Sequence, residues 1–98
     1  MASYVMLVNW TEQGIQAYRD TLDRSETTRQ LAEKLGASVK ELYWTLGAYD
    51  VVGIVEAPDD ETMTAVALAL SSQGNVRTTT MRAFGPDEMR QIVAKATG

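Results

Sequence analysis

Four short apolar and β-branched runs, with helical spacing after the first and third, constrain the fold more than any other feature of this chain. Each run is too short for a core helix and carries residues that favour strands, so each predicts a β-strand. The predicted strands are Tyr4–Asn9, Ser38–Leu46, Tyr49–Ala57 and Asn75–Phe84.

The intervening segments predict helices. Thr11 can cap a helix directly after the first strand. A polar stretch, residues 23–28, interrupts the apolar stripe of that helix before Gly36 supplies a left-handed stop, so we expect a kink or two helical pieces. Further helices are predicted after Pro58 and from Pro86 onward.

The order βαββαβ followed by a helix predicts an α+β fold. Two βαβ units with right-handed crossovers interleave most simply as a ferredoxin-like sandwich with an extra C-terminal helix. The 98 residues suffice for one domain, spanning residues 1–98, with the helices of both units on one face of the sheet.

The second face of the predicted sheet lacks the polar alternation that contact with water requires. Strict alternation in the second strand puts Trp44 on one face and Val39 and Tyr43 on the other, and we expect Tyr43 and Trp44 to serve core or dimer packing. The C-terminal helix could cover part of the second face, but a second copy of the sheet covers more. We therefore expect a homodimer through the open sheet face. Neighbouring apolar residues fall on both sides of the pleat in three strands: Val5, Met6, Leu7 and Val8; Leu42, Tyr43 and Trp44; Val51, Val52, Ile54 and Val55.

Composition excludes several kinds of chemistry. The chain has no cysteine and no histidine, which removes thiolate nucleophiles, zinc fingers and imidazole bases. The acidic run Asp59-Asp60-Glu61 is typical of a helix start, so we expect neither a metal nor a cofactor. A net charge of −4 disfavours nucleic acid. No signal peptide or membrane span is apparent, so we expect no membrane contact and a cytoplasmic location.

The topology predicts a candidate site at one end of the sheet. The end of the first strand, the turn between the second and third strands, and the start of the fourth strand all lie there. A carboxylate beside aromatic rings there can acquire the pKa of a general base, although an aspartate in a hairpin more commonly stabilises the turn. The candidate catalytic residues are Asp50 and Tyr49, and the candidate ligand-binding residues are Asn9, Trp10, Gly47, Asn75 and Arg77.

The chain resembles the GYD-domain family of small bacterial and archaeal proteins nearly from end to end. The resemblance rests on separate blocks in the right order, and the name-giving Gly, Tyr and Asp fall on Gly47, Tyr49 and Asp50, with Ala48 between the first two. It implies a ferredoxin-like fold of the dimeric α/β-barrel type and no established activity. The blocks are residues 4–7, 10–15, 31–36, 45–52, 56–61, 74–80 and 82–84.

Three functions are therefore considered. The favoured one is a homodimeric module that binds a small ligand or assembles with a partner without turnover. The alternative is a cofactor-free isomerase, cyclase or monooxygenase acting on a small organic acid, with Asp50 as base and Tyr49, Trp10 and Arg77 positioning the substrate. Nucleic-acid binding is the third, and the charge of the chain argues against it.

Overall fold

The computed structural model describes residues 1–98 and confirms the expected order of elements. None of its helices combines the length and the hydropathy that crossing a membrane would require. The strands are β1 (Ala2–Trp10), β2 (Ser38–Trp44), β3 (Val51–Ala57) and β4 (Val76–Ala83). The helices are α1 (Glu12–Gln16), α2 (Thr21–Lys34), α3 (Asp60–Ser71) and α4 (Pro86–Thr97), with a 3₁₀ turn, η1 (Tyr18–Asp20), before α2.

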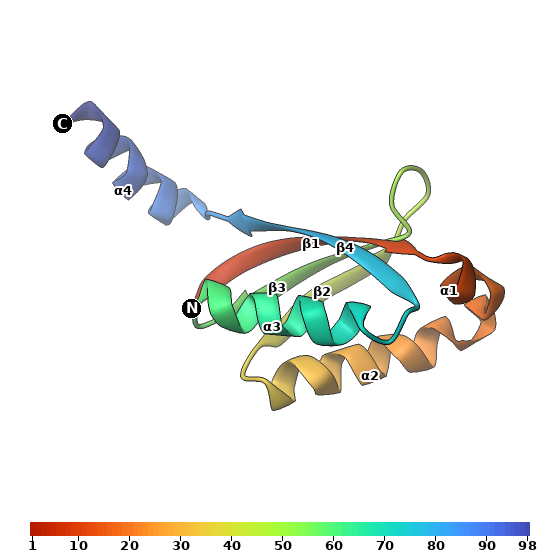
Figure 1. The fold of residues 1–98 in the computed structure, drawn as a ribbon. Helices are drawn as coiled ribbons and strands as arrows, with labels where there is room; N and C mark the ends of the chain where they lie inside the picture. The colour runs from red at the N-terminus through yellow and green to blue at the C-terminus, as the bar shows by residue number, and fades with distance from the viewer.

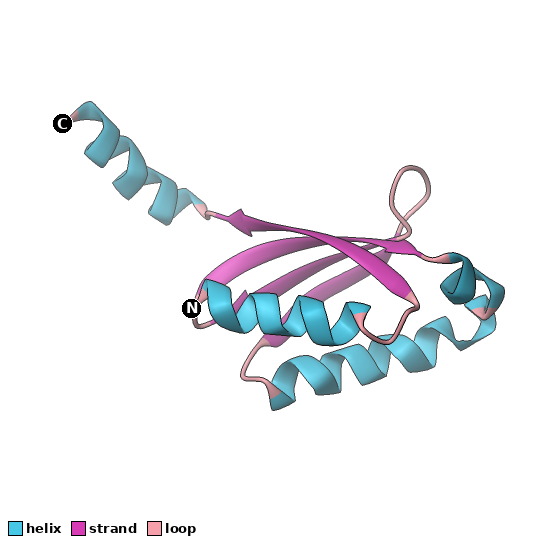
Figure 2. Ribbon diagram, viewed as in Figure 1, coloured by secondary structure: helices cyan, strands magenta, loops and turns pink.

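The strands form one antiparallel sheet in the order β2-β3-β1-β4. β1 and β2 therefore run in one direction, and β3 and β4 run in the other. Helices α2 and α3 lie side by side against the same face of the sheet (Figure 1, Figure 2). This α+β arrangement is compatible with the predicted ferredoxin-like fold.

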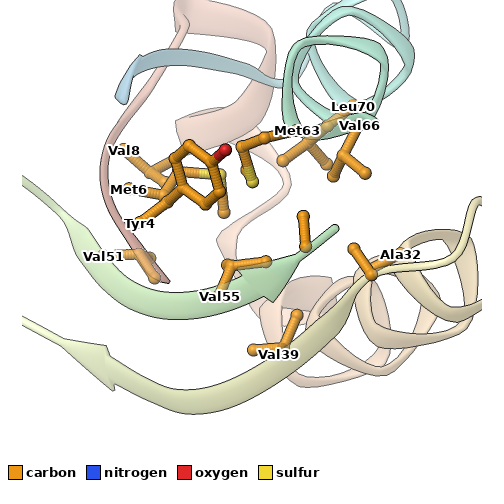
Figure 3. Close-up of a cluster of buried hydrophobic side chains, with 12 residues drawn as sticks. Tyr4, Met6, Val8, Ala32, Val39, Val51, Val55, Met63, Val66 and Leu70 are labelled. Carbon is orange, nitrogen blue, oxygen red and sulfur yellow. The ribbon is translucent and has the colours of Figure 1, made fainter. Parts of the chain in front are cut away.

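The core lies between the sheet and these two helices. Alternate residues of β1 and β3 are buried against the helices, which is the period-two pattern of strands with one covered face. Met6 of β1 and Met63 of α3 are almost completely buried, and each contributes about 1.5–3 kcal/mol by leaving water. Figure 3 shows these side chains converging with Val55 and Val66 between the layers.

The helical segment after β1 breaks earlier than its polarity predicts. The break lies at Ala17–Asp20, between α1 and α2, whereas the polar stretch 23–28 lies inside α2. The hydroxyls of Ser25, Thr27 and Thr28 donate to backbone carbonyls of the preceding turn, so these residues are satisfied within a continuous helix.

The predicted alternation of β2 is wrong at its start. Its pairing with β3 shifts by one residue between Val39 and Glu41, which is a β-bulge. The bulge returns Val39 to the helix-covered face, where it is buried together with the core, while Tyr43 stays on the opposite face from Trp44. A one-residue bulge moves every side chain that precedes it in the strand to the other face of the sheet.

Helix α4 does not cover the sheet. It begins directly after β4, projects away from the body of the molecule and has no buried residue (Figure 1). The open face of the sheet is thus left uncovered by every element of its own chain.

Candidate functional site

The predicted site residues do gather at one end of the sheet. Trp10, the last residue of β1, pairs with Val76, the first residue of β4, and Val51 opens β3 beside the end of β1. The six residues 45–50 that join β2 to β3 leave the sheet at the same end. The end of β1, the link between β2 and β3, and the start of β4 therefore lie at the same end of the sheet.

Asp50 anchors this end of the sheet. Its carboxylate Oδ2 accepts a hydrogen bond from the backbone N–H of Trp10 at 2.9 Å, and its own backbone N–H donates to the carbonyl of Val8 at 2.9 Å. Its carbonyl in turn accepts from the backbone N–H of Thr45 at 2.9 Å. One side chain thus joins the link 45–50 to the end of β1, which is the structural role that hairpin aspartates commonly have.

The segment joining α3 to β4 is fixed to the start of α1 by Asn75. The Asn75 carbonyl accepts from the backbone N–H of Thr11 at 3.0 Å, and its side-chain oxygen accepts from the amide of Gln13 at 2.9 Å. Thr11 also caps α1 through the N–H of Gly14 and donates its hydroxyl proton to the Gly74 carbonyl. Both oxygen atoms of Asn75 therefore already accept hydrogen bonds within the protein.

Asn9 and Arg77 are separated from Trp10 by the sheet. They pair across β1 and β4, and the alternation of β1 places them on the open face. Trp10 lies on the helix-covered face, where it packs against the core. The predicted ligand-binding residues therefore do not converge on one cavity, because adjacent strand residues point to opposite faces.

The link 45–50 stands away from the end of the sheet as an open loop (Figure 1). Gly47 adopts a positive φ of 122°, and Leu46 beside it is fully exposed. Tyr49 uses its backbone carbonyl to accept from the Thr45 hydroxyl. This six-residue loop replaces the two-residue turn, residues 47–48, that the predicted strands Ser38–Leu46 and Tyr49–Ala57 leave between them.

A small apolar cavity lies under this end of the sheet, between the helix-covered face and α2. We call it the tryptophan cavity, because it is lined by Trp10 and Trp44, both tryptophans of the chain. Its volume is about 50 Å³. The remaining lining residues are Met6, Val8, Leu42, Val51, Leu70 and Val76, with Thr21, Arg24, Ser25 and Thr28 of α2.

Polar groups of α2 in this lining were missed from the sequence. The Arg24 guanidinium donates to the carbonyls of Gly14 and Ala17, at 3.2 and 2.5 Å, and so closes the end of α1. The indole N–H of Trp44 donates to the Thr21 hydroxyl at 2.9 Å. No local sequence pattern indicates that these residues line a cavity, because the polar stretch 23–28 has the composition of an ordinary solvated helix face.

The open face of the sheet is an apolar surface that no helix covers. We define it by Val5 and Leu7 of β1, Tyr43 of β2, Val52 and Ile54 of β3, and Met81 of β4, which are neighbours in the strand register. Tyr43 is 57% exposed and Met81 is 47% exposed. The Tyr43 hydroxyl donates to Glu41, and this hydrogen bond raises the pKa of Tyr43.

The opposite end of the sheet carries a polar cluster formed by Tyr4, Asp60 and Arg82. The Tyr4 hydroxyl donates to Asp60 at the start of α3, and this bond raises the pKa of Tyr4 to about 12. Arg82 of β4 lies over the Phe84 ring and pairs with Glu88 of α4 at 2.9 Å, which lowers the pKa of Glu88. The contacts of Arg82 hold the start of α4 against the end of β4.

Comparison with known proteins agrees with this geometry. A Thermus thermophilus protein named "Glutamine synthetase and cystathionine beta-lyase binding protein" is 33% identical over 85 residues, which cover 86% of this chain and 90% of that protein. The crystal structure of TTHA0845 from Thermus thermophilus is similar with a TM-score of 0.57 at 25% identity, covering 87% of this chain and 95% of that one. The crystal structure of FFRP-DM1 has a similar fold, with a TM-score of 0.62 at 20% identity and coverage of 86% and 100%. The model of the GYD domain matches residues 4–93, and the chain therefore belongs to the GYD domain family.

Proposed function

We propose that this protein is a homodimeric binding module that associates with a metabolic enzyme and does not itself turn over a substrate. The observation that carries the proposal is the open face, an apolar sheet surface that no element of its own chain covers. Monomeric proteins rarely leave such a contiguous surface exposed to water.

A second copy is the occupant that best fits the open face. Two-fold symmetry places the same apolar patch on both sides of the interface, so the surface is complementary to itself. Phe84, which follows β4, and Met89 and Val93 of α4 are also about half exposed. Association of two copies would bury sheet and helix surfaces together.

Binding to an enzyme is proposed from the relative's name, which states that the Thermus protein binds glutamine synthetase and cystathionine beta-lyase. We extend that role to this chain, with the corresponding enzymes of its own organism as the partners. The engaged Asp50 carboxylate supports binding without turnover, because one of its oxygens already holds the Trp10 backbone.

The exposed loop 45–50 is the surface we propose for the enzyme. Leu46 is fully exposed there, on a loop that projects from the end of the sheet on the side away from α2 and α3 (Figure 1). A fully exposed leucine on a projecting loop contributes little to the stability of its own fold, and burying its side chain against a partner removes apolar surface from water.

Biolayer interferometry with purified glutamine synthetase and cystathionine β-lyase from the same organism tests this proposal. The parent protein should bind at least one of the two enzymes, and Leu46→Ser should weaken that binding about tenfold or more. Leu68→Ser, which changes an exposed leucine on α3, is the matched control and should bind like the parent. Absence of binding to both enzymes contradicts the enzyme role, and equal binding by Leu46→Ser contradicts the loop as the docking surface.

A further inference from the structure

We propose that the tryptophan cavity binds a small branched aliphatic carboxylate, with its apolar tail between the tryptophans and its carboxylate at Arg24. This ligand site goes beyond the proposed function. It lies on the helix-covered side of the sheet and is complete within one copy, so it does not depend on the homodimer or on an enzyme partner.

The size and lining of the cavity define the tail of the ligand. A volume of about 50 Å³ has room for about four water-sized groups. Most of its wall is apolar, and protein interiors pack closely enough that an unfilled space of this size is uncommon. A chain of about four carbons fills such a space, whereas an aromatic ring system does not.

Arg24 supplies a fixed positive charge at the cavity. It is partly buried, and none of the three ion pairs of the protein involves it. Two of its five N–H groups hold the carbonyls of Gly14 and Ala17, and the others have no acceptor in the protein. A guanidinium held in place with free donors is well suited to a carboxylate.

A hydroxyl beside Arg24 offers one more donor. Thr21 accepts the indole N–H of Trp44, so its own hydroxyl proton is free to donate. The hydroxyls of Ser25 and Thr28, in contrast, already donate to carbonyls of α2. One guanidinium and one hydroxyl match a monoanion, and the net charge of −4 disfavours a polyanion such as a phosphate ester.

The test is a titration with 3-methylbutanoate followed by nuclear magnetic resonance of the tryptophan indole N–H groups. Trp10 and Trp44 are the only tryptophans and both line the cavity, so two signals report on the site without interference. The acid should shift both signals saturably. 3-Methylbutanamide, which keeps the tail but lacks the charge, should bind about tenfold more weakly, and acetate, which lacks the tail, should not saturate.

Two variants locate the binding site. Arg24→Gln retains amide donors for the two carbonyls but removes the charge, so the preference for the acid over the amide should disappear. Val76→Leu adds a methylene to the cavity wall with Arg24 intact and should weaken acid binding about tenfold or more. Val93→Leu makes the same exchange on α4, outside the cavity, and should bind the acid like the parent.

No saturable shift of either indole signal overturns the proposal. A preference for the acid that survives in Arg24→Gln also overturns it, as does unchanged binding by Val76→Leu. If Arg24→Gln fails to fold, Val76→Leu and its control decide the result. Failure of the homodimer or of enzyme binding would leave these readouts unaffected, because the cavity is formed within one chain.

Discussion

The carboxylate of Asp50 holds the backbone N–H of Trp10 at 2.9 Å, across 40 positions of sequence. Together with the hydrogen bond from the Asp50 backbone to the Val8 carbonyl, it joins the end of β1 to the start of β3. The aspartate of the family signature thus stabilises the fold by holding these two strand ends together. Gly47 of the same signature supplies the positive φ that the loop 45–50 needs.

This anchoring role predicts how Asp50 responds to substitution. Asp50→Ala removes the acceptor of the Trp10 N–H and should lower the free energy of unfolding by about 1–2 kcal/mol. Asp50→Asn keeps an oxygen in the same place and should lose much less. Urea unfolding of the three proteins measures both values. An Asp50→Ala protein as stable as the parent would contradict the anchoring role.

Gly14 is predicted to be the least replaceable glycine. A Cβ atom at this position would lie 2.0 Å from the Asn75 carbonyl oxygen, a backbone atom that is itself fixed by Thr11. Gly14→Ala should therefore cost about 3 kcal/mol of unfolding free energy. Gly85→Ala is the matched control, because a Cβ there meets nothing within 4 Å, and it should cost less than about 1 kcal/mol. Similar losses in the two variants would contradict the close contact.

Tyr4 is predicted to make stability depend on alkaline pH. Its hydrogen bond to Asp60 raises its pKa from 10.0 to about 12, so the folded state favours the neutral phenol. This contribution is complete below pH 10 and is lost as the pH rises through about 12. Melting temperatures measured between these pH values should fall for the parent and fall less for Tyr4→Phe. Tyr18→Phe, which changes an exposed tyrosine, should follow the parent. An equal decline in all three proteins would contradict this role of Tyr4.

The fold was predictable because each strand carries its own local signal. The position of the candidate cluster also followed, since strand order and direction decide which ends meet. The face of the sheet on which Val39 lies could not be predicted, because the bulge at residues 39–41 is not visible in the apolar and polar alternation of the sequence. The helix break at Ala17–Asp20 was equally hidden, because Arg24 stabilises it from the next helix.

The candidate site was less predictable than the fold. Asp50 and Asn75 stood out as polar residues at strand ends, but their hydrogen bonds are made to backbone groups far away in sequence. The tryptophan cavity depends on α2 lying over Trp44, which is a tertiary relationship. Arg24 lies in a stretch that resembles a solvated surface, and only its contacts give it a role.

The proposed homodimer predicts a selective effect of charge on the open face. Ile54 lies between Glu41 of β2 and Val5 of β1, in the middle of that face. Ile54→Lys should weaken self-association about a hundredfold or more, because each copy would bury an unpaired charge. The monomer should remain folded, since Ile54 is partly exposed within a single copy.

Size-exclusion chromatography with light scattering, together with circular dichroism, separates these effects. Leu68→Lys introduces the same charge on α3, away from the open face, and is the matched control. It should associate like the parent. Loss of association in both variants, or in neither, would contradict an interface at the open face.

Sedimentation equilibrium of the unmodified protein at micromolar concentration tests the central claim most directly. If a second copy covers the open face, the protein sediments with twice the mass of its chain, and dilution dissociates it only well below that concentration. A protein that sediments with the mass of a single chain at micromolar concentration would contradict the claim.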